Sequence, residues 1–292
     1  MKVAVVVTVK NEEADILKLL RALEAQSRVP DILVLTIADS EDKTVQIVTD
    51  WAALTSLKTK IDYVDGNRSK GRNLGIQHAI RHGAKIVVLT NVCQPFTDWL
   101  ETLVKPIEVD GKAVVGGSWI LDSRRDREDA MGLLTQYDVD QLDASKISAL
   151  NMAVRASAFH WAGDFREDLD TSEDTEFVQR LRDKGIELVY EPDAMVLWRP
   201  STLNLRDAAK TYYQFAKTDR KAGLKTGQYL ATGGVYLAIG VLVLVNPLFG
   251  ALSLGGWLLF RARKVFFTQQ LPAMMLAAFV LDWARIIGFS AE

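Results

Sequence analysis

The chain has 292 residues, 49% of them hydrophobic, and its 35 basic and 37 acidic residues leave a formal net charge of −2. This length accommodates one large domain with a smaller appendix, and the near-neutral charge gives no overall field that would attract nucleic acid. The single cysteine, Cys93, cannot form an internal disulfide, so nothing indicates an oxidising compartment and a cytosolic soluble part fits best.

Apolar strands alternate with amphipathic helices over the first 90 residues. Residues 3–7 form a continuous β-branched run that is typical of a buried parallel strand, and it is too short for a signal sequence. Periodicity predicts further strands at 32–37, 61–64 and 85–90, and helices at 16–24, 44–51 and 69–82. The pattern indicates an α/β fold with a mostly parallel sheet between helices.

The following region is less regular. Strands predicted at 114–120, 151–154 and 188–190 indicate a mixed second half of the sheet, and the charged stretch 122–129 is expected to form an exposed loop or lid. Ligands of such sheets bind outside the carboxyl ends of the strands. Residues 8–12, Asp39 and the pair Thr90-Asn91 should therefore converge on one crevice.

The composition changes near residue 226. Uncharged apolar stretches at 229–245 and 248–260 are separated by Asn246-Pro247, and a further stretch runs from 271 to 289 with Asp282 and Arg285 inside it. Because a spanning helix needs about 20 apolar residues, we expect two or three membrane helices within 226–292, behind a soluble domain at 1–225.

Basic residues flank the apolar stretches. Four precede the first stretch and three follow the second: Lys217, Arg220, Lys221 and Lys225, and then Arg261, Arg263 and Lys264. By the positive-inside rule, both groups place the soluble domain on the cytoplasmic side of the cell membrane. The alternative is a hydrophobic hairpin that packs on the soluble domain or on a second copy. Asp282 and Arg285 favour this alternative, because charges at bilayer depth are costly.

Five motifs occur in the order of a known family. VVVTVKNEE at 5–13, ADSEDKT at 38–44 and SKGRNLG at 69–75 resemble the nucleotide-binding half of family 2 inverting glycosyltransferases with the GT-A fold. LNMAVR at 150–155 and SEDTEF at 172–177 resemble their acceptor half. The resemblance covers residues 3–225. It implies a Rossmann-like nucleotide-diphospho-sugar transferase domain that moves a sugar, with inversion, onto a lipid-linked or membrane-proximal glycan acceptor in polysaccharide or glycolipid biosynthesis.

The resemblance also implies roles for individual residues. A diphosphate leaving group gains negative charge as the glycosidic bond breaks, so amides and cations gather around it. Asp174 would be the general base that takes the proton of the acceptor hydroxyl, with Glu173 contacting the acceptor or raising the proton affinity of the base. The donor would be bound by Thr8, Val9, Lys10, Asn11, Glu12, Asp39, Lys70, Arg72, Asn73, Thr90 and Asn91, and the acceptor side would include Asn151, Met152 and Trp198.

The residues taken alone leave other interpretations open. Asp39 or Asp42 suits a helix N-cap or Asx turn equally well, and Arg72 would often be a surface cation. The acids Glu173 and Asp174 also suit the first turn of a helix that Ser172 caps, with Glu176 closing a capping box. The segment 190–200, followed by YYQF at 212–215, also resembles the family where it meets the membrane. Its aromatic residues and cations suit either an interfacial helix that carries a lipid-linked acceptor or an amphipathic helix that closes the core.

One departure from the family concerns metal binding. The family has Asp-x-Asp where this chain has Thr90-Asn91-Val92, so the carboxylates that would hold Mg²⁺ or Mn²⁺ on the diphosphate are missing. Three explanations follow. The diphosphate and one oxygen could hold the metal; Lys70, Arg72, or a lid residue such as Arg124 or Arg125, could neutralise charge without metal; or transfer could be lost. We assign no metal ligand and expect metal-independent or weakly metal-dependent transfer.

Two rival functions remain. The first is a non-catalytic relative that binds a nucleotide sugar or serves as a scaffold, and the missing acids are its chief support. The second, a nucleotidyltransferase, would need a glycine- and arginine-rich phosphate loop after the first strand, where this chain has Thr8, Val9 and Lys10 instead.

Overall fold

The computed structural model describes residues 1–121, 147–199, 204–262 and 271–291. These residues form two compact units: 1–121 with 147–199, and 204–262 with 271–291. The predicted charged loop at 122–129, with Arg124 and Arg125, lies outside the described residues.

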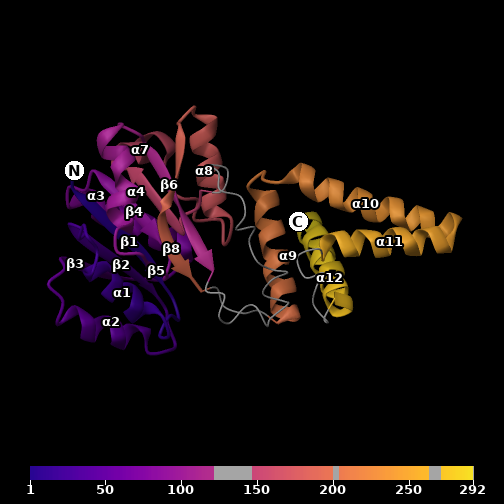
Figure 1. Ribbon diagram of the computed structural model, residues 1–292, viewed down its shortest axis with the longest axis horizontal. Helices are drawn as coiled ribbons and strands as arrows, with labels where there is room; N and C mark the ends of the chain where they lie inside the picture. Colours follow the sequence, from indigo (N-terminus) through magenta and orange to yellow (C-terminus); the bar gives the residue numbers. More distant parts are fainter. Residues whose placement is uncertain (122–146, 200–203, 263–270, 292) are drawn as a thin grey trace. The chain divides into compact units, whose positions relative to one another are not determined.

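The first unit is built on a mixed sheet with helices on both faces (Figure 1). In its described part the sheet has eight strands in the order β3-β2-β1-β4-β7-β6-β8-β5. The strands are β1 Val3–Val9, β2 Ile32–Ala38, β3 Thr59–Val64, β4 Ile86–Thr90, β5 Gln94–Pro95, β6 Val114–Leu121, β7 Asn151–Arg155 and β8 Leu188–Trp198. The helices are α1 Ile16–Glu24, α2 Thr44–Ala52, α3 Arg68–Arg81, α4 Trp99–Val109, α7 Ala156–Ala162 and α8 Glu173–Asp183.

The predicted parallel half of the sheet is confirmed. β1 pairs in parallel with β2 on one side and β4 on the other, and β2 pairs in parallel with β3. Successive side chains of β1 point to opposite faces. Val3, Val5 and Val7 pack with α1, α2 and α4, whereas Ala4 and Val6 belong to the cluster of α3, α7 and α8. Both faces of β1 are covered, which explains why its sequence is apolar throughout.

The second half of the sheet is mixed, as expected. β7 pairs antiparallel with β4 and β6, and β6 pairs in parallel with β8. The predicted end of the last strand at Tyr190 is wrong, because β8 continues to Trp198. The register shifts between Gly117 and Ser118 of β6, so that Pro192 and its neighbours leave the ladder as an irregularity and pairing then resumes.

Helix α3 lies unusually close to the sheet. A Cβ atom at Gly75 would come within 2.4 Å of Cγ1 of Val6, and one at Gly71 within 3.1 Å of Cγ2 of Thr8. Only glycine permits this approach without displacement of the neighbours. The first turns of α3 are thereby held against the carboxyl ends of β1 and β2.

The second unit contains α9 Leu205–Lys221, α10 Thr226–Val245, α11 Pro247–Arg261 and α12 Leu271–Ser290. Helix α9 packs along α12, and α10 and α11 form a hairpin around Asn246 (Figure 1). By length and composition, α10 and residues 273–290 of α12 could each cross a membrane, which is weak evidence for membrane association.

Candidate active site

Two loops at the carboxyl edge of the sheet are joined by hydrogen bonds. Asn11, after β1, adopts the left-handed conformation (φ 53°) that asparagine tolerates. Its amide donates to Oγ of Ser40, and its Oδ1 accepts from the amide of Glu41 at 2.9 Å. The amide of Glu12 donates to Oγ1 of Thr44 at 2.7 Å. The predicted convergence of the turns after β1 and β2 is therefore present.

The two aspartates after β2 make different contacts. Asp42 takes the turn role, because its carboxylate accepts from the amides of Thr44 and Glu13 at 3.0 Å each. Asp39 is exposed at the rim and makes no hydrogen bond or ion pair with the residues that the structure describes. Its carboxylate is thus available to a ligand, as is the exposed side chain of Lys10.

The side chains after β1 differ in the polar groups that they present to a ligand. Thr8 is half-buried against α3, and Val9 points into the core, so only its backbone faces the loop. Burial raises the pKa of Glu12 from 4.5 to about 7, with further contributions from Asp15 and Asp42 that outweigh Arg68. A carboxyl group in this state can donate as well as accept a hydrogen bond near neutral pH.

A buried ion pair connects the two halves of the unit. Arg72 of α3 is only 3% exposed and Glu173, at the start of α8, only 1%. Nη1 of Arg72 donates to Oε1 of Glu173, and its Nη2 donates to Oδ1 of Asn91 at 3.3 Å. The interpretation of Arg72 as a surface cation is wrong. Three motifs that are far apart in the sequence meet at this guanidinium.

Arg68 is a further cation at this point, which the motif comparison did not select. It is the first residue of α3, four residues before Arg72 and therefore on the same helix face. Its side chain is 55% exposed, and its Nη1 lies 3.9 Å from the same Oε1 of Glu173, beyond hydrogen-bond distance. Two guanidinium groups thus share one carboxylate, and the outer one is held loosely. The i, i+4 spacing was the sequence signal that could have identified it.

Asp174 follows Glu173 but lies in a different environment. It is half-buried, and its Oδ2 accepts from the amide of Ala149 at 3.2 Å while its Oδ1 accepts from the amide of Thr175 at 2.8 Å. The two amides orient the carboxylate. Ser172 precedes α8 in a left-handed conformation and makes no capping side-chain bond, and the carboxylate of Glu176 bonds to Arg180. The capping-box interpretation is therefore wrong.

The residues that replace Asp-x-Asp do not form a carboxylate metal site. The hydroxyl of Thr90 donates to the carbonyl of Leu150 at 3.0 Å, and Oδ1 of Asn91 already accepts from Arg72. Within the described residues, no three His, Cys, Asp or Glu side chains are grouped so that they could hold a metal ion. A guanidinium at this position also disfavours a nearby cation.

Several other candidate residues form structural contacts. Asn73 is buried and bonds through its side chain to the backbone of Phe165. Asn151 is also buried: its amide nitrogen donates to the carbonyls of Ser118 and Ala194, and its oxygen accepts from Nε1 of Trp99. Nζ of Lys70 donates to the carbonyl of Asp65.

The two remaining acceptor-side candidates differ in solvent exposure. Met152 is completely buried in the core, so its side chain offers no atom to an acceptor in this structure. Trp198, the last residue of β8, is half-buried at the carboxyl edge. Of the two, only Trp198 has an accessible side-chain surface.

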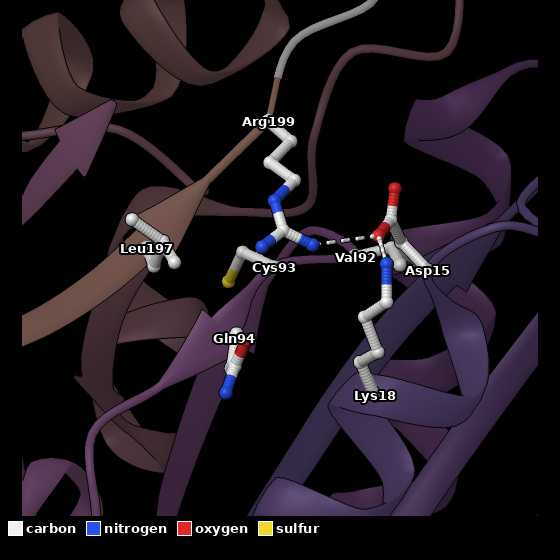
Figure 2. A pocket seen from close by; sticks show the side chains of 7 residues that line it. All are labelled: Asp15, Lys18, Val92, Cys93, Gln94, Leu197 and Arg199. Carbon is white, nitrogen blue, oxygen red and sulfur yellow. Dashed lines mark hydrogen bonds and ion pairs between the residues drawn. The ribbon is translucent and has the colours of Figure 1, made fainter. Parts of the chain in front are cut away.

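A small pocket lies where β8 ends next to the loop after β4 (Figure 2). Arg199 and Lys18 both bond to Oδ1 of Asp15, at 3.3 and 2.6 Å, so their charges are partly compensated. Cys93 also lines the pocket, and burial raises the pKa of its thiol to about 12. A thiol with this pKa stays protonated and is a poor nucleophile.

The sequence matches the family model described as "Glycosyl transferase family 2" over residues 4–162, which is more than half of the chain. Among proteins with curated annotation, none matches the sequence.

Solved structures match over almost the whole chain. One is the mannosyltransferase PcManGT from Pyrobaculum calidifontis in complex with GDP-Man and Mn²⁺, with 18% identity, a TM-score of 0.65 and coverage of 97% of this chain and 87% of that one. Another is S. aureus TarS 1–349 in complex with UDP-GlcNAc, with 16% identity, a TM-score of 0.55 and coverage of 99% and 91%. At these identities the likeness concerns the fold, which is the GT-A fold of glycosyltransferases.

Proposed function

This chain belongs to glycosyl transferase family 2, and we propose that it transfers a sugar from a nucleotide-sugar donor, with inversion, to a lipid-linked or membrane-proximal acceptor. The observation that carries the proposal is the contact of Arg72 with Glu173 and Asn91, which brings the donor motif on α3 and the acceptor motif on α8 to one edge of the sheet. The solved relatives PcManGT and TarS, in complexes with GDP-Man and UDP-GlcNAc, support a donor of this class.

The donor would occupy the edge formed by the loops after β1 and β2 and by the start of α3. Asp39 is exposed there, as a residue that accepts hydrogen bonds from ribose hydroxyls must be. Glu12, with its raised pKa, can donate to or accept from the base or ribose. Thr8 and Asn11 complete this side of the site.

Asp174 is the proposed general base. Inversion by a single displacement needs one carboxylate that faces the acceptor hydroxyl and removes its proton. Asp174 is partly exposed and is oriented by the amides of Ala149 and Thr175. Glu173 is buried and bonded to Arg72, so we assign it the role of a positioning residue that fixes the start of α8 relative to α3.

Arg68 is proposed to neutralise the leaving diphosphate. Arg72 is buried and already paired, and Lys70 is bonded to the carbonyl of Asp65. Arg68 is more than half exposed and only loosely paired, so its guanidinium can turn from Glu173 to a phosphate with little loss. This assignment supports transfer that depends weakly or not at all on divalent metal, although PcManGT was solved with Mn²⁺.

Membrane association and a cytoplasmic orientation complete the proposal. The two long apolar helices in residues 226–292 support attachment to the cell membrane, and the basic residues beside them favour the cytoplasmic side for the domain at 1–225. An enzyme attached to the membrane suits an acceptor that is itself anchored in lipid.

The test is transfer by Asp174→Asn in the purified full-length protein. Loss of a general base should lower kcat by about 10²–10⁴-fold while the affinity for the donor stays unchanged. Asp183→Asn, at the exposed end of the same helix, is the matched control and should transfer normally. Full activity of Asp174→Asn would remove the assignment of the base.

The alternative is a nucleotide-sugar-binding scaffold without transfer. The absence of carboxylates at Thr90 and Asn91 is the observation that favours it. Under this alternative the wild-type protein binds donor but produces no nucleoside diphosphate with any membrane acceptor. Binding without turnover across a panel of nucleotide sugars and lipid extracts would support the scaffold.

A further inference from the structure

The end of the α10–α11 hairpin is apolar and uncovered. Residues 226–260 contain no charged side chain, and every residue from 241 to 249 is exposed. Leu244 is 86% exposed and Leu248 67%. At the tip, Oδ1 of Asn246 accepts from the amides of Leu248 and Phe249, so the polar groups of the turn are partly satisfied within the hairpin.

Helix α12 differs from the hairpin because it contains charged residues, although its length and hydropathy also suit a membrane span. Its Asp282 is completely buried and accepts from Nε of Arg261 at 3.0 Å, from Nη1 of Arg285 at 3.2 Å and from the hydroxyl of Tyr236 at 3.2 Å. Arg261 is the last residue of α11. A polar cluster therefore holds α12 to the end of α11 and to the middle of α10, away from the apolar tip.

Helix α12 also runs along α9, which is a charged helix. A Cβ atom at Gly288 would come within 2.3 Å of the carbonyl oxygen of Tyr213, and the guanidinium of Arg285 lies 4.0 Å from the ring centre of Tyr212. Helix α9 exposes five basic residues: Arg206, Lys210, Lys217, Arg220 and Lys221. If α12 crossed the hydrocarbon layer, α9 and its charges would have to enter it as well, at high cost.

We propose that the hairpin α10–α11 enters a lipid bilayer and returns to the side from which it came, while α9 and α12 stay at that surface. In Figure 1 the hairpin extends away from the α9–α12 pair. Beyond Tyr236, the residue of α10 that bonds to Asp282, α10 continues for about 14 Å to Val245, and α11 with its 15 residues is about 22 Å long. Both lengths fall short of the roughly 30 Å of a bilayer core. Arg261, which bonds to Asp282 at the end of α11, then lies at the level of the anionic headgroups.

The proposal deepens the membrane association proposed above and is independent of sugar transfer. It places Ser290, the last residue of α12, on the same side of the membrane as the first unit. A spanning α12 would place Ser290 on the opposite side.

The test uses cysteine labelling in sealed membrane vesicles of both orientations. Ser290→Cys at the exposed end of α12 and Lys105→Cys on the exposed surface of α4 are treated separately with a membrane-impermeant maleimide. The buried Cys93 makes the wild-type protein the background control. Both variants should react in the same vesicle orientation. Reaction of Ser290→Cys only in the opposite orientation would overturn the proposal.

A second pair of variants tests which helix is inserted. Leu244→Glu near the tip and Leu276→Glu on α12 change side chains that are 86% and 60% exposed, so neither should disturb packing. Leu244→Glu should lower the fraction that resists carbonate extraction by about tenfold, and Leu276→Glu should leave it unchanged. Equal loss in both variants would contradict the proposal. Complete extraction of the wild-type protein would remove insertion altogether and leave the proposed sugar transfer untouched.

Discussion

Removing the carboxylate of Glu173 should loosen the attachment of α8 to α3. Both partners of the ion pair with Arg72 are almost completely buried, at 1% and 3% exposure. Removing one partner of a buried pair costs about 3–5 kcal/mol, because the remaining charge is left without compensation in a medium of low polarity. For Glu173→Gln we expect about 2–3 kcal/mol, since the amide oxygen can still accept one hydrogen bond and Asn91 remains 3.3 Å from the guanidinium.

The assay is hydrogen exchange of the full-length protein in detergent, which reports the free energy of local opening in α3 and α8. A double-mutant cycle with Arg72→Met isolates the energy of the pair from the other effects of each substitution. The pair of Glu176 and Arg180, also on α8, is the matched control. Its atoms are 2.8 Å apart, but it is more exposed and spans one helical turn, so its coupling should be below about 1 kcal/mol.

A coupling energy for Arg72 and Glu173 no larger than that of the control would refute the reasoning. It would mean that the two side chains are solvated or separated in solution. The donor motif and the acceptor motif would then not be joined through this contact.

Three further outcomes follow from individual residues. Because the pKa of Glu12 is raised from 4.5 to about 7 in the folded state, the wild-type protein should lose stability as the pH rises from about 4.5 to 7, and Glu12→Gln should not. At pH 8, above both values, a thermal-shift series should show the variant gaining about 1–2 kcal/mol after allowance for partial exposure. Parallel curves for the two proteins would count against the burial of Glu12. Asn91→Asp adds a hard oxygen ligand beside Arg72 and should increase the stimulation of transfer by Mn²⁺, so an unchanged metal response would exclude this position from the diphosphate site. Gly75→Ala places a Cβ atom 2.4 Å from Val6 and should lower the free energy of unfolding, measured with denaturant, by about 1–3 kcal/mol. Gly71→Ala, whose nearest contact is 3.1 Å, should cost less. An unchanged free energy of unfolding in Gly75→Ala would contradict the close packing of α3.

The strands and helices of the first 90 residues follow from local pattern, because a strand buried on both faces is apolar throughout and a helix on its surface is apolar every third or fourth residue. The end of β8 could not be predicted in this way. Glu191-Pro192-Asp193 has the composition of a turn, and only the register shift in the neighbouring β6 allows the strand to continue past it.

The site residues could likewise be predicted only where the signal is local in the sequence. The motif order identified the loops after β1 and β2 and the start of α8, but neighbouring residues of a helix point in directions about 100° apart. Glu173 and Asp174 therefore have different surroundings, which their adjacency in the sequence conceals. The burial of Arg72 depends on a partner 101 residues away, and Asn151 is held by three separate elements. Such long-range contacts leave no local signal.

The most direct measurement is a crystal structure of the full-length protein with a bound nucleotide sugar. The diphosphate should lie beside Arg68 at the start of α3, with the base near Asp39 and the anomeric carbon of the sugar facing the carboxylate of Asp174. A donor bound at another edge of the sheet, or one whose sugar is turned away from Asp174, would contradict the proposed transfer.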